Sequence, residues 1–145
     1  MTLAELAKEG KFKPHITGKS EINRLLSLFE RDIADAGIIA LSVDRRFATA
    51  YNAALVVSIA ALAACSLRAP NEGHHFWTIQ SLAHTLEVDT TIIDLFNQFR
   101  LKRNKCDYER IGLISTIELS EMIELALKLR DKFETWLKVV HPELI

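Results

Sequence analysis

A long apolar run near the middle of the chain limits most strongly what this sequence can fold into. The run reads AALVVSIAALAACSL, extends from Ala53 to Leu67, and is bounded by Asn52 and Arg68. Its fifteen residues are fewer than the roughly twenty that a helix needs to cross a bilayer. A helix without a polar face has partners on several sides. We therefore predict either the central helix of a bundle or half of a dimer interface, and no membrane span.

The remaining sequence also favours helices. Only five glycines and three prolines interrupt the chain, and its abundant Leu, Ala, Glu and Lys are good helix formers. No window alternates β-branched and polar residues as a half-buried strand does. We predict an all-α fold, an antiparallel up-and-down bundle of four long helices plus a short N-terminal helix. Residues 1–145 form one domain, with the N-terminal helix and arm over 1–19 and the helical bundle over 20–141.

Capping residues and helix-breaking residues give the expected helix boundaries. Ser20 and Ser42 are typical N-caps, Ser115 and Glu118 have capping-box spacing, and Gly37 is a typical helix end. The expected helices run over Leu3–Glu9, from Ser20 to Ala36, from Ser42 to the region before Pro70, over Phe76–Leu86, from Asp89 or Thr90 onward, and from Ser115 to Pro142. The segments GKFKPHITGK and PNEGHH are expected to be an arm and a loop.

The charge balance and the cysteine content limit which functions this chain can have. The chain has 18 basic and 19 acidic side chains, whereas a protein that binds duplex nucleic acid through many phosphates usually has a strong basic excess. Any nucleic-acid contact must therefore come from a local patch. Cys65 and Cys106 are too few for a disulfide framework, and the N-terminal MTLAELAKEGKFK lacks the apolar core of a signal peptide. We expect a cytoplasmic, reduced protein.

One cation in the later part of the chain falls on an apolar stripe. The stretch FRLKRNKCDYERIG begins at Phe99 and follows an apolar run. At about 100° per residue counted from Ile92, one direction is shared within about 45° by Phe96, Phe99, Arg103 and Cys106. A guanidinium stays charged, so a buried one needs acceptors or a water-filled cleft. The alternative is that the helix ends near Leu101 and that Arg103 extends into water at its margin.

Polar neighbours of Arg103 suit the binding of an anion. Asn104 can donate and accept hydrogen bonds, and Asp107, one turn later, can orient the guanidinium. Arg100 adds positive potential, and two arginines with an amide form a suitable clamp for a phosphate or an oxyanion. Lys102 points away from the stripe and is expected to be solvated.

Residues on facing helices are further candidates, because sites in helical bundles draw on several helices. His75 could reach across the bundle toward Arg103 and act as a base there. Asn52 either is a satisfied core amide or helps to hold Arg103. His84 follows His74 and His75 at a spacing that is out of phase for a shared metal face, and no Cys-x-x-Cys or His-Glu-x-x-His pattern occurs. We expect no metal and no cofactor.

Three successive segments carry a resemblance to a known family. They read RRFATAYNAALVVSIAALAA, GHHFWTIQSLAHTL and RLKRNKCDYE, and over about residues 20–140 the chain resembles the HEPN family of small all-helical proteins. Active members of that family are metal-independent ribonucleases that dimerise so that two motifs face one cleft, and several are toxins neutralised by a nucleotidyltransferase-type partner. The resemblance implies a homodimer, RNA or a nucleotide as ligand, and a nucleotidyltransferase-type antitoxin as a possible partner.

The resemblance also assigns residues, with one departure. Arg103 matches the family arginine and Asn104 the polar residue after it. The family pattern then has a histidine one to two turns later, where this chain offers Tyr108 followed by Glu109 and Arg110. Imidazole, with a pKa of about 6.5, can take a proton from a ribose hydroxyl, whereas a phenol with a pKa of about 10 is a poor base. Tyr108 is instead expected to donate a hydrogen bond to a phosphate or to stack on a base.

These observations leave three functional hypotheses. The first is a HEPN-like protein that binds nucleic acid or a nucleotide without efficient catalysis, through Arg103, Asn104, Arg100, Asp107 and Tyr108. The second is an active endoribonuclease toxin in which Tyr108 or His75 transfers protons. The third is a structural helical adaptor whose cationic stretch is a solvated helix end.

Overall fold

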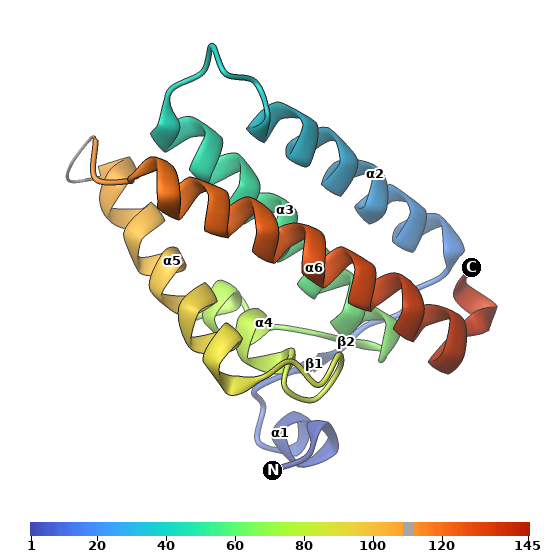
Figure 1. Cartoon of the computed structure of the whole chain (residues 1–145). Helices are drawn as coiled ribbons and strands as arrows, with labels where there is room; N and C mark the ends of the chain where they lie inside the picture. The colour runs from blue at the N-terminus through green and yellow to red at the C-terminus, as the bar shows by residue number, and fades with distance from the viewer. Residues whose placement is uncertain (109–111) are drawn as a thin grey trace.

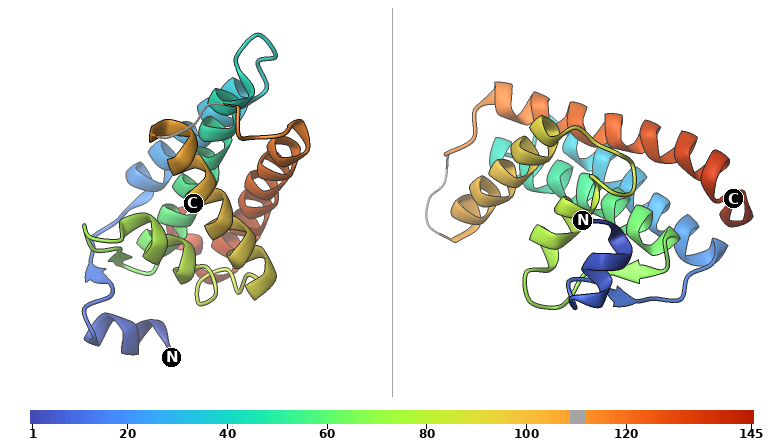
Figure 2. Two further views of the ribbon diagram at one scale, coloured as in Figure 1. Left: turned by 90° about the vertical axis from the view of Figure 1, so that its left-hand side faces the viewer. Right: turned by 90° about the horizontal axis from the view of Figure 1, so that it is seen from below.

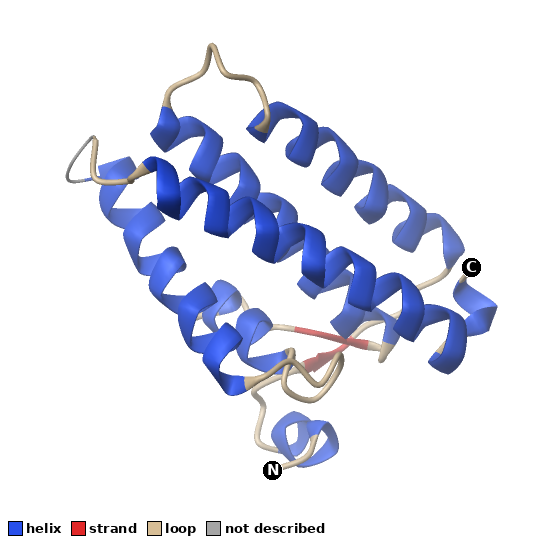
Figure 3. Ribbon diagram, viewed as in Figure 1, coloured by secondary structure: helices blue, strands red, loops and turns tan. Residues whose placement is uncertain are grey.

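The computed structural model describes residues 1–108 and 112–145, with the side chains of Asp107 and Tyr108 outside that description. The described residues form six α-helices, one two-stranded sheet and a short 3-10 helix (Figures 1 and 3). In chain order the elements are α1 Leu3–Lys8, β1 Lys13–Pro14, α2 Lys19–Ala36, α3 Val43–Ala64, β2 Leu67–Arg68, α4 His74–Ser81, α5 Thr90–Tyr108, α6 Thr116–Val140 and η1 Pro142–Leu144. The prediction of a mostly helical chain is confirmed, and the small sheet was not predicted.

Helix α3 lies at the centre of the helical packing. It packs mainly against α2 and α6, and it also contacts α4 and α5 (Figure 1). The alanines Ala53, Ala54, Ala60 and Ala61 are fully buried. By length and composition α3 could cross a membrane, but 72% of its most apolar window is buried inside the structure. The apolar run is therefore a core helix, and its small side chains allow the neighbouring backbones to come close.

Side-chain caps set the starts of two helices as predicted. The Ser42 Oγ accepts a hydrogen bond from the Arg45 backbone N–H at 3.2 Å, directly before α3. Ser115 and Glu118 form a complete capping box at α6, with two reciprocal hydrogen bonds of 3.1 Å. Gly37 follows α2 as its C-cap. These bonds satisfy backbone groups that have no partner within the helix itself.

Several predicted helix boundaries are wrong, and one of them is the end of α3, which lies at Ala64 rather than next to Pro70. Helix α2 begins one residue before Ser20, because Gly18 rather than Ser20 occupies the N-cap position. Helix α4 begins inside the predicted loop and ends at Ser81 instead of Leu86. At its end the Ser81 Oγ donates to the Thr78 carbonyl oxygen at 2.6 Å, so a side chain competes with the backbone for a helical acceptor.

The N-terminal arm is tied to the bundle by the small sheet. Lys13 of β1 pairs with Arg68 of β2 in antiparallel register, and the His15 backbone N–H donates to the Ser66 carbonyl oxygen at 2.9 Å. Phe12 is 1% exposed and packs with the end of α3 in a second, smaller apolar cluster. Two-residue strands are too short to show the alternation that identifies a strand in a sequence.

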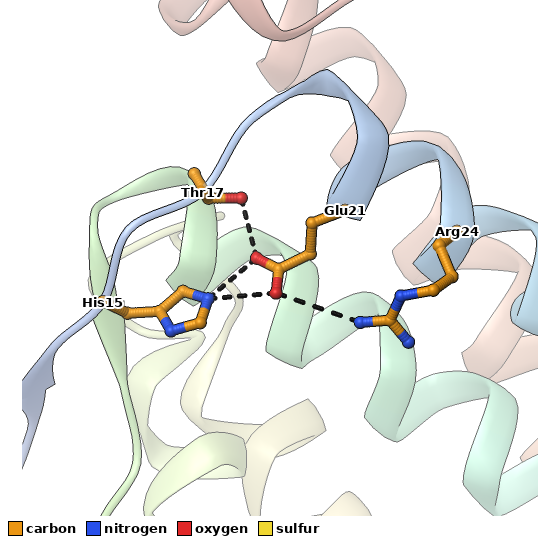
Figure 4. Close-up of polar contacts among 4 residues, drawn as sticks. All are labelled: His15, Thr17, Glu21 and Arg24. Carbon is orange, nitrogen blue, oxygen red and sulfur yellow. Dashed lines mark hydrogen bonds and ion pairs between the residues drawn. The ribbon is translucent and has the colours of Figure 1, made fainter.

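A carboxylate in the first turn of α2 also holds the arm (Figure 4). The Glu21 carboxylate oxygens lie 2.8 and 3.0 Å from the His15 Nε2, and the Thr17 hydroxyl donates to Oε1 at 2.7 Å. The Arg24 Nη2 lies 3.9 Å from the Glu21 Oε2. Burial raises the pKa of Glu21, but the hydrogen bonds from His15 and Thr17 outweigh burial and place this pKa below its ordinary value of 4.5. The ionised carboxylate therefore stabilises the folded state.

Replacing Glu21 with glutamine tests this contribution. At pH 7 the Glu21→Gln protein should lose about 1 kcal/mol of unfolding free energy, the size of a partly exposed charge-assisted contact. The folded-state pKa is lowered, so the stabilisation is present above pH 4.5 and disappears as the pH falls through the folded-state pKa. Urea denaturation at several pH values measures the difference. The exposed Glu124→Gln is the control, and a Glu21 effect that does not change with pH contradicts the assignment.

Candidate functional site

Arg103 lies on the inner side of α5. The helix continues beyond Leu101 to Tyr108, so the alternative in which it ends near Leu101 is wrong. Leu101 is 48% exposed, whereas Phe99 is 4% exposed and Arg103 is half-buried. The Arg103 Cζ lies 5.5 Å from the centre of the Tyr51 ring. The guanidinium therefore covers a core aromatic ring, where a cation and a ring attract each other.

Tyr51 of α3 joins this arginine to helix α4. Its side chain is fully buried, and its hydroxyl lies 3.1 Å from the His75 Nδ1 in a hydrogen bond. Phe96 of α5 supports the ring edge-on, with ring centres 5.6 Å apart. Burial raises the pKa of Tyr51 well above its ordinary value, although the charges of Arg103 and Arg100 act in the opposite direction. The phenol therefore stays protonated and serves as a hydrogen-bonding group.

His75 lies in the first turn of α4 and is half-buried. Burial lowers the pKa of His75 below its ordinary value of 6.5, and nearby His74, Arg103 and Arg100 lower it further. The imidazole is consequently neutral near pH 7, the form that can accept a proton. The structure thus places His75 across the bundle beside Arg103, with Tyr51 between them.

Arg100 lies one turn before Arg103 on the same helix. Its Nε donates to the Asn97 Oδ1 at 2.9 Å, and its Cζ lies 5.8 Å from the centre of the Phe76 ring. Its charge acts on both Tyr51 and His75. The two arginines therefore create a positive region along the contact between α5 and α4.

A groove of about 830 Å³ opens beside Arg103. It lies between the start of α3 and the last turns of α5, and Arg45 and Thr49 line its α3 side. Asp44 also lines the groove, where its Oδ2 accepts the Gly112 backbone N–H at 2.7 Å. The volume is in the range of small-molecule sites, about 300–1,000 Å³. The groove can therefore hold a group as large as a nucleotide against Arg103.

The other predicted site residues contribute less to the described geometry. Asn104 and Asn52 are half-buried, and neither side chain hydrogen-bonds to another residue in the described ranges. The side chains of Asp107 and Tyr108 lie outside the described part of the structure. Lys102, expected to be solvated, instead forms an ion pair with Glu118 of α6. The roles of Asn104, Asn52, Asp107 and Tyr108 stay predictions.

The sequence reasoning did not find the role of Tyr51, the residue that connects the site. A signal existed, because a tyrosine inside an apolar helix needs a partner for its hydroxyl. The partner itself depends on how α3 and α4 are rotated against each other, which local spacing does not show. Phe76 was likewise not predicted beside Arg100.

The cluster combines two guanidinium groups, a neutral imidazole and a buried phenol. Such groups can bind a phosphate through charge-assisted hydrogen bonds and can accept a proton at the imidazole. Among the described residues, no three His, Cys, Asp or Glu side chains lie together as metal ligands would. Comparison of the chain with known protein families, with curated protein sequences and with solved structures finds no significant match.

Proposed function

We propose that this chain is a HEPN-like protein that binds RNA or a nucleotide through a phosphate, without efficient catalysis. The phosphate is held by Arg103 and Arg100, and His75 faces it from α4. One observation carries the proposal: the Arg103 guanidinium lies 5.5 Å from the Tyr51 ring centre, and the Tyr51 hydroxyl bonds to His75. A half-buried arginine held in this way is oriented before a ligand arrives, which lowers the entropy lost on binding.

The near-neutral composition supports a small local site. With 18 basic and 19 acidic side chains the whole molecule has little general attraction for a polyanion, so affinity must come from a few oriented cations. Asn104, Asp107 and Tyr108 follow Arg103 on α5 and are proposed to complete the clamp. The groove that Arg45 shares with Arg103 gives the remainder of the ligand a place beside the phosphate.

The architecture and the partners belong to the same proposal. Helices α2, α3, α5 and α6 are proposed to form the antiparallel up-and-down bundle of the HEPN type. A homodimer would bring two copies of the Arg103 site together, and a nucleotidyltransferase-type protein would act as antitoxin if the site cleaves RNA. We expect the protein to act in the cytoplasm.

A metal-independent endoribonuclease is the second candidate, because of His75. The pKa of this histidine is lowered by burial and by the neighbouring cations, so the neutral ring is available as a general base near pH 7. In the tautomer whose Nδ1–H donates to the Tyr51 oxygen, the His75 Nε2 would take the proton of a ribose 2′-hydroxyl while Arg103 holds the adjacent phosphate. Cleavage also requires an acid for the leaving oxygen, and we propose Tyr108 for that role.

The test mixes the purified protein with fluorescently labelled single-stranded RNA, and in parallel with a labelled nucleotide, at low salt in the presence of a chelator. Binding is followed by fluorescence anisotropy, and cleavage by gel electrophoresis of the same samples. The proposal predicts binding without cleavage. Cleavage that is lost in Arg103→Ala establishes the ribonuclease instead, and absence of binding to both RNA and nucleotides overturns the proposal in favour of a structural adaptor.

A further inference from the structure

The first turn of α4 carries four consecutive ring side chains, His74, His75, Phe76 and Trp77, all half-buried. Three other elements bring cations to these rings. We call the rings and these cations the α4 surface, and the cations are Lys11 of the N-terminal arm, Arg68 of β2, and Arg100 and Arg103 of α5. The arm, α4 and α5 are neighbours in two views of the molecule (Figure 2).

Two of the four rings have a cation over their face. The Lys11 Nζ lies 5.0 Å from the centre of the Trp77 ring, and the Arg100 Cζ lies 5.8 Å from that of Phe76. Burial lowers the pKa of His74, and the charge of Arg68 lowers it further. The α4 surface therefore combines aromatic faces with positive charges from the arm, β2 and α5.

The aromatic rings are held in fixed positions. Phe76 and Trp77 are stacked, with ring centres 5.2 Å apart and planes at 24°. The buried Phe12 contacts Trp77 edge-on at 6.2 Å. Gly73 has a φ of +70°, and a Cβ there would lie 3.3 Å from the Trp77 Cδ1, so the absence of a side chain allows the indole to rest on the backbone. Little entropy is lost when a ligand binds to rings already oriented in this way.

We propose that the α4 surface is a stacking platform for single-stranded RNA, so that the ligand of the Arg103 site is a strand of several nucleotides rather than a mononucleotide. Bases stack on half-exposed aromatic rings whatever their sequence, while lysines and arginines follow the phosphates. Lys11 has a flexible stem and can leave the Trp77 face to meet a phosphate as a base arrives. This inference rests on the proposed function, because the strand is anchored at Arg103.

Two ligands separate the platform from the anchor. One is the dinucleotide pUpU, and the other is an oligouridine of about twelve nucleotides, a length within the usual site size of single-strand binders. Trp77→Leu should weaken binding of the longer strand about tenfold, the loss of one stacked base, and leave the dinucleotide affinity unchanged. The affinity for the longer strand falls as salt rises, and Lys11→Gln should make the slope of log affinity against log salt shallower by about 0.7.

Trp136→Leu is the matched control, because Trp136 of α6 is a half-buried tryptophan in ring contacts with Phe133 and with His141, the residue that follows α6. It should change neither affinity. The chain has two tryptophans, so in a Trp136→Phe protein the fluorescence of Trp77 should be quenched by the longer strand and not by the dinucleotide.

The outcomes distinguish the inference from the proposed function. Dinucleotide binding together with an unchanged longer-strand affinity in both Trp77→Leu and Lys11→Gln overturns the platform and leaves the Arg103 site intact. Failure of both ligands to bind overturns the proposed function and the platform with it. An acidic peptide with the same net charge as the longer strand serves as a competitor. If it displaces the strand, the platform is also overturned, because the α4 surface is then assigned to a protein partner.

Discussion

Replacing Arg103 with alanine is expected to weaken the binding of single-stranded RNA by roughly ten- to a hundredfold. The guanidinium is held over the Tyr51 ring at 5.5 Å and is proposed to make charge-assisted hydrogen bonds to a phosphate. Such bonds contribute about 1.5–3 kcal/mol, and each 1.4 kcal/mol or so is a factor of ten in affinity. Arg103→Lys should recover only part of the loss, because lysine keeps the charge without the two-pronged geometry.

Lys105→Ala is the control for this experiment. Lys105 is exposed on the same helix, so its removal changes the net charge equally without touching the Tyr51 ring. Fluorescence anisotropy at low salt gives the affinities, and urea denaturation shows that each variant is folded. Equal, small losses in Arg103→Ala and Lys105→Ala would mean that only net charge matters, and the site at Arg103 would be wrong.

Replacing Phe96 with alanine is expected to lower the free energy of unfolding by about 3–5 kcal/mol. Phe96 is fully buried and packs edge-on against Tyr51 with ring centres 5.6 Å apart. Removing a buried phenylalanine loses its transfer free energy and leaves a cavity. Domains of this size are stable by only about 5–15 kcal/mol in total, so the variant should unfold at a much lower urea concentration.

Leu101→Ala on the same helix provides the comparison. Leu101 is 48% exposed, and exposed substitutions usually change stability by about 0.5 kcal/mol or less. Equal losses for Phe96→Ala and Leu101→Ala would show that the packing of α5 against α3 is different from the one described. A folded Phe96→Ala protein should in addition bind RNA more weakly, because Tyr51 loses the ring that supports it.

The helices could be predicted because local signals specify them. Ser42 and Ser115 are caps whose bonds lie within three residues of the cap itself, so the sequence contains the whole interaction. The core position of α3 followed from its lack of a polar face. Ile93 was not predicted to be buried, although it is 4% exposed and lies on the same inner side of α5 as Phe96 and Phe99.

The small sheet and the end of α4 depend on contacts that no local pattern shows. Lys13 meets Arg68 across more than fifty residues, and each strand has two residues, too few for a periodic signal. Helix α4 stops at Ser81, where hydroxyl groups take backbone acceptors although the apolar spacing continues. Tertiary packing and side-chain competition therefore outweighed the helical pattern at these places.

One feature of the candidate site, the inward direction of Arg103, could be predicted from the sequence. The inward direction of Arg103 follows from helix geometry alone, and the structure places its guanidinium on a core ring. The meeting of Tyr51 with His75 depends on the relative rotation of α3 and α4, and the position of Lys11 depends on the β1–β2 pair. Those residues come from distant parts of the chain, and only the folded structure brings them together.

The most direct test of the central claim is the titration of His75 by NMR, with and without RNA. The claim is that Arg103 and His75 face one bound phosphate across Tyr51. In the free protein the pKa of His75 should lie below 6.5 because of burial and the neighbouring cations, and the bound phosphate should raise it by favouring the imidazolium. The Arg103→Ala protein should show a higher His75 pKa without RNA and no further rise with it. A His75 titration that is the same with and without bound RNA would contradict the account.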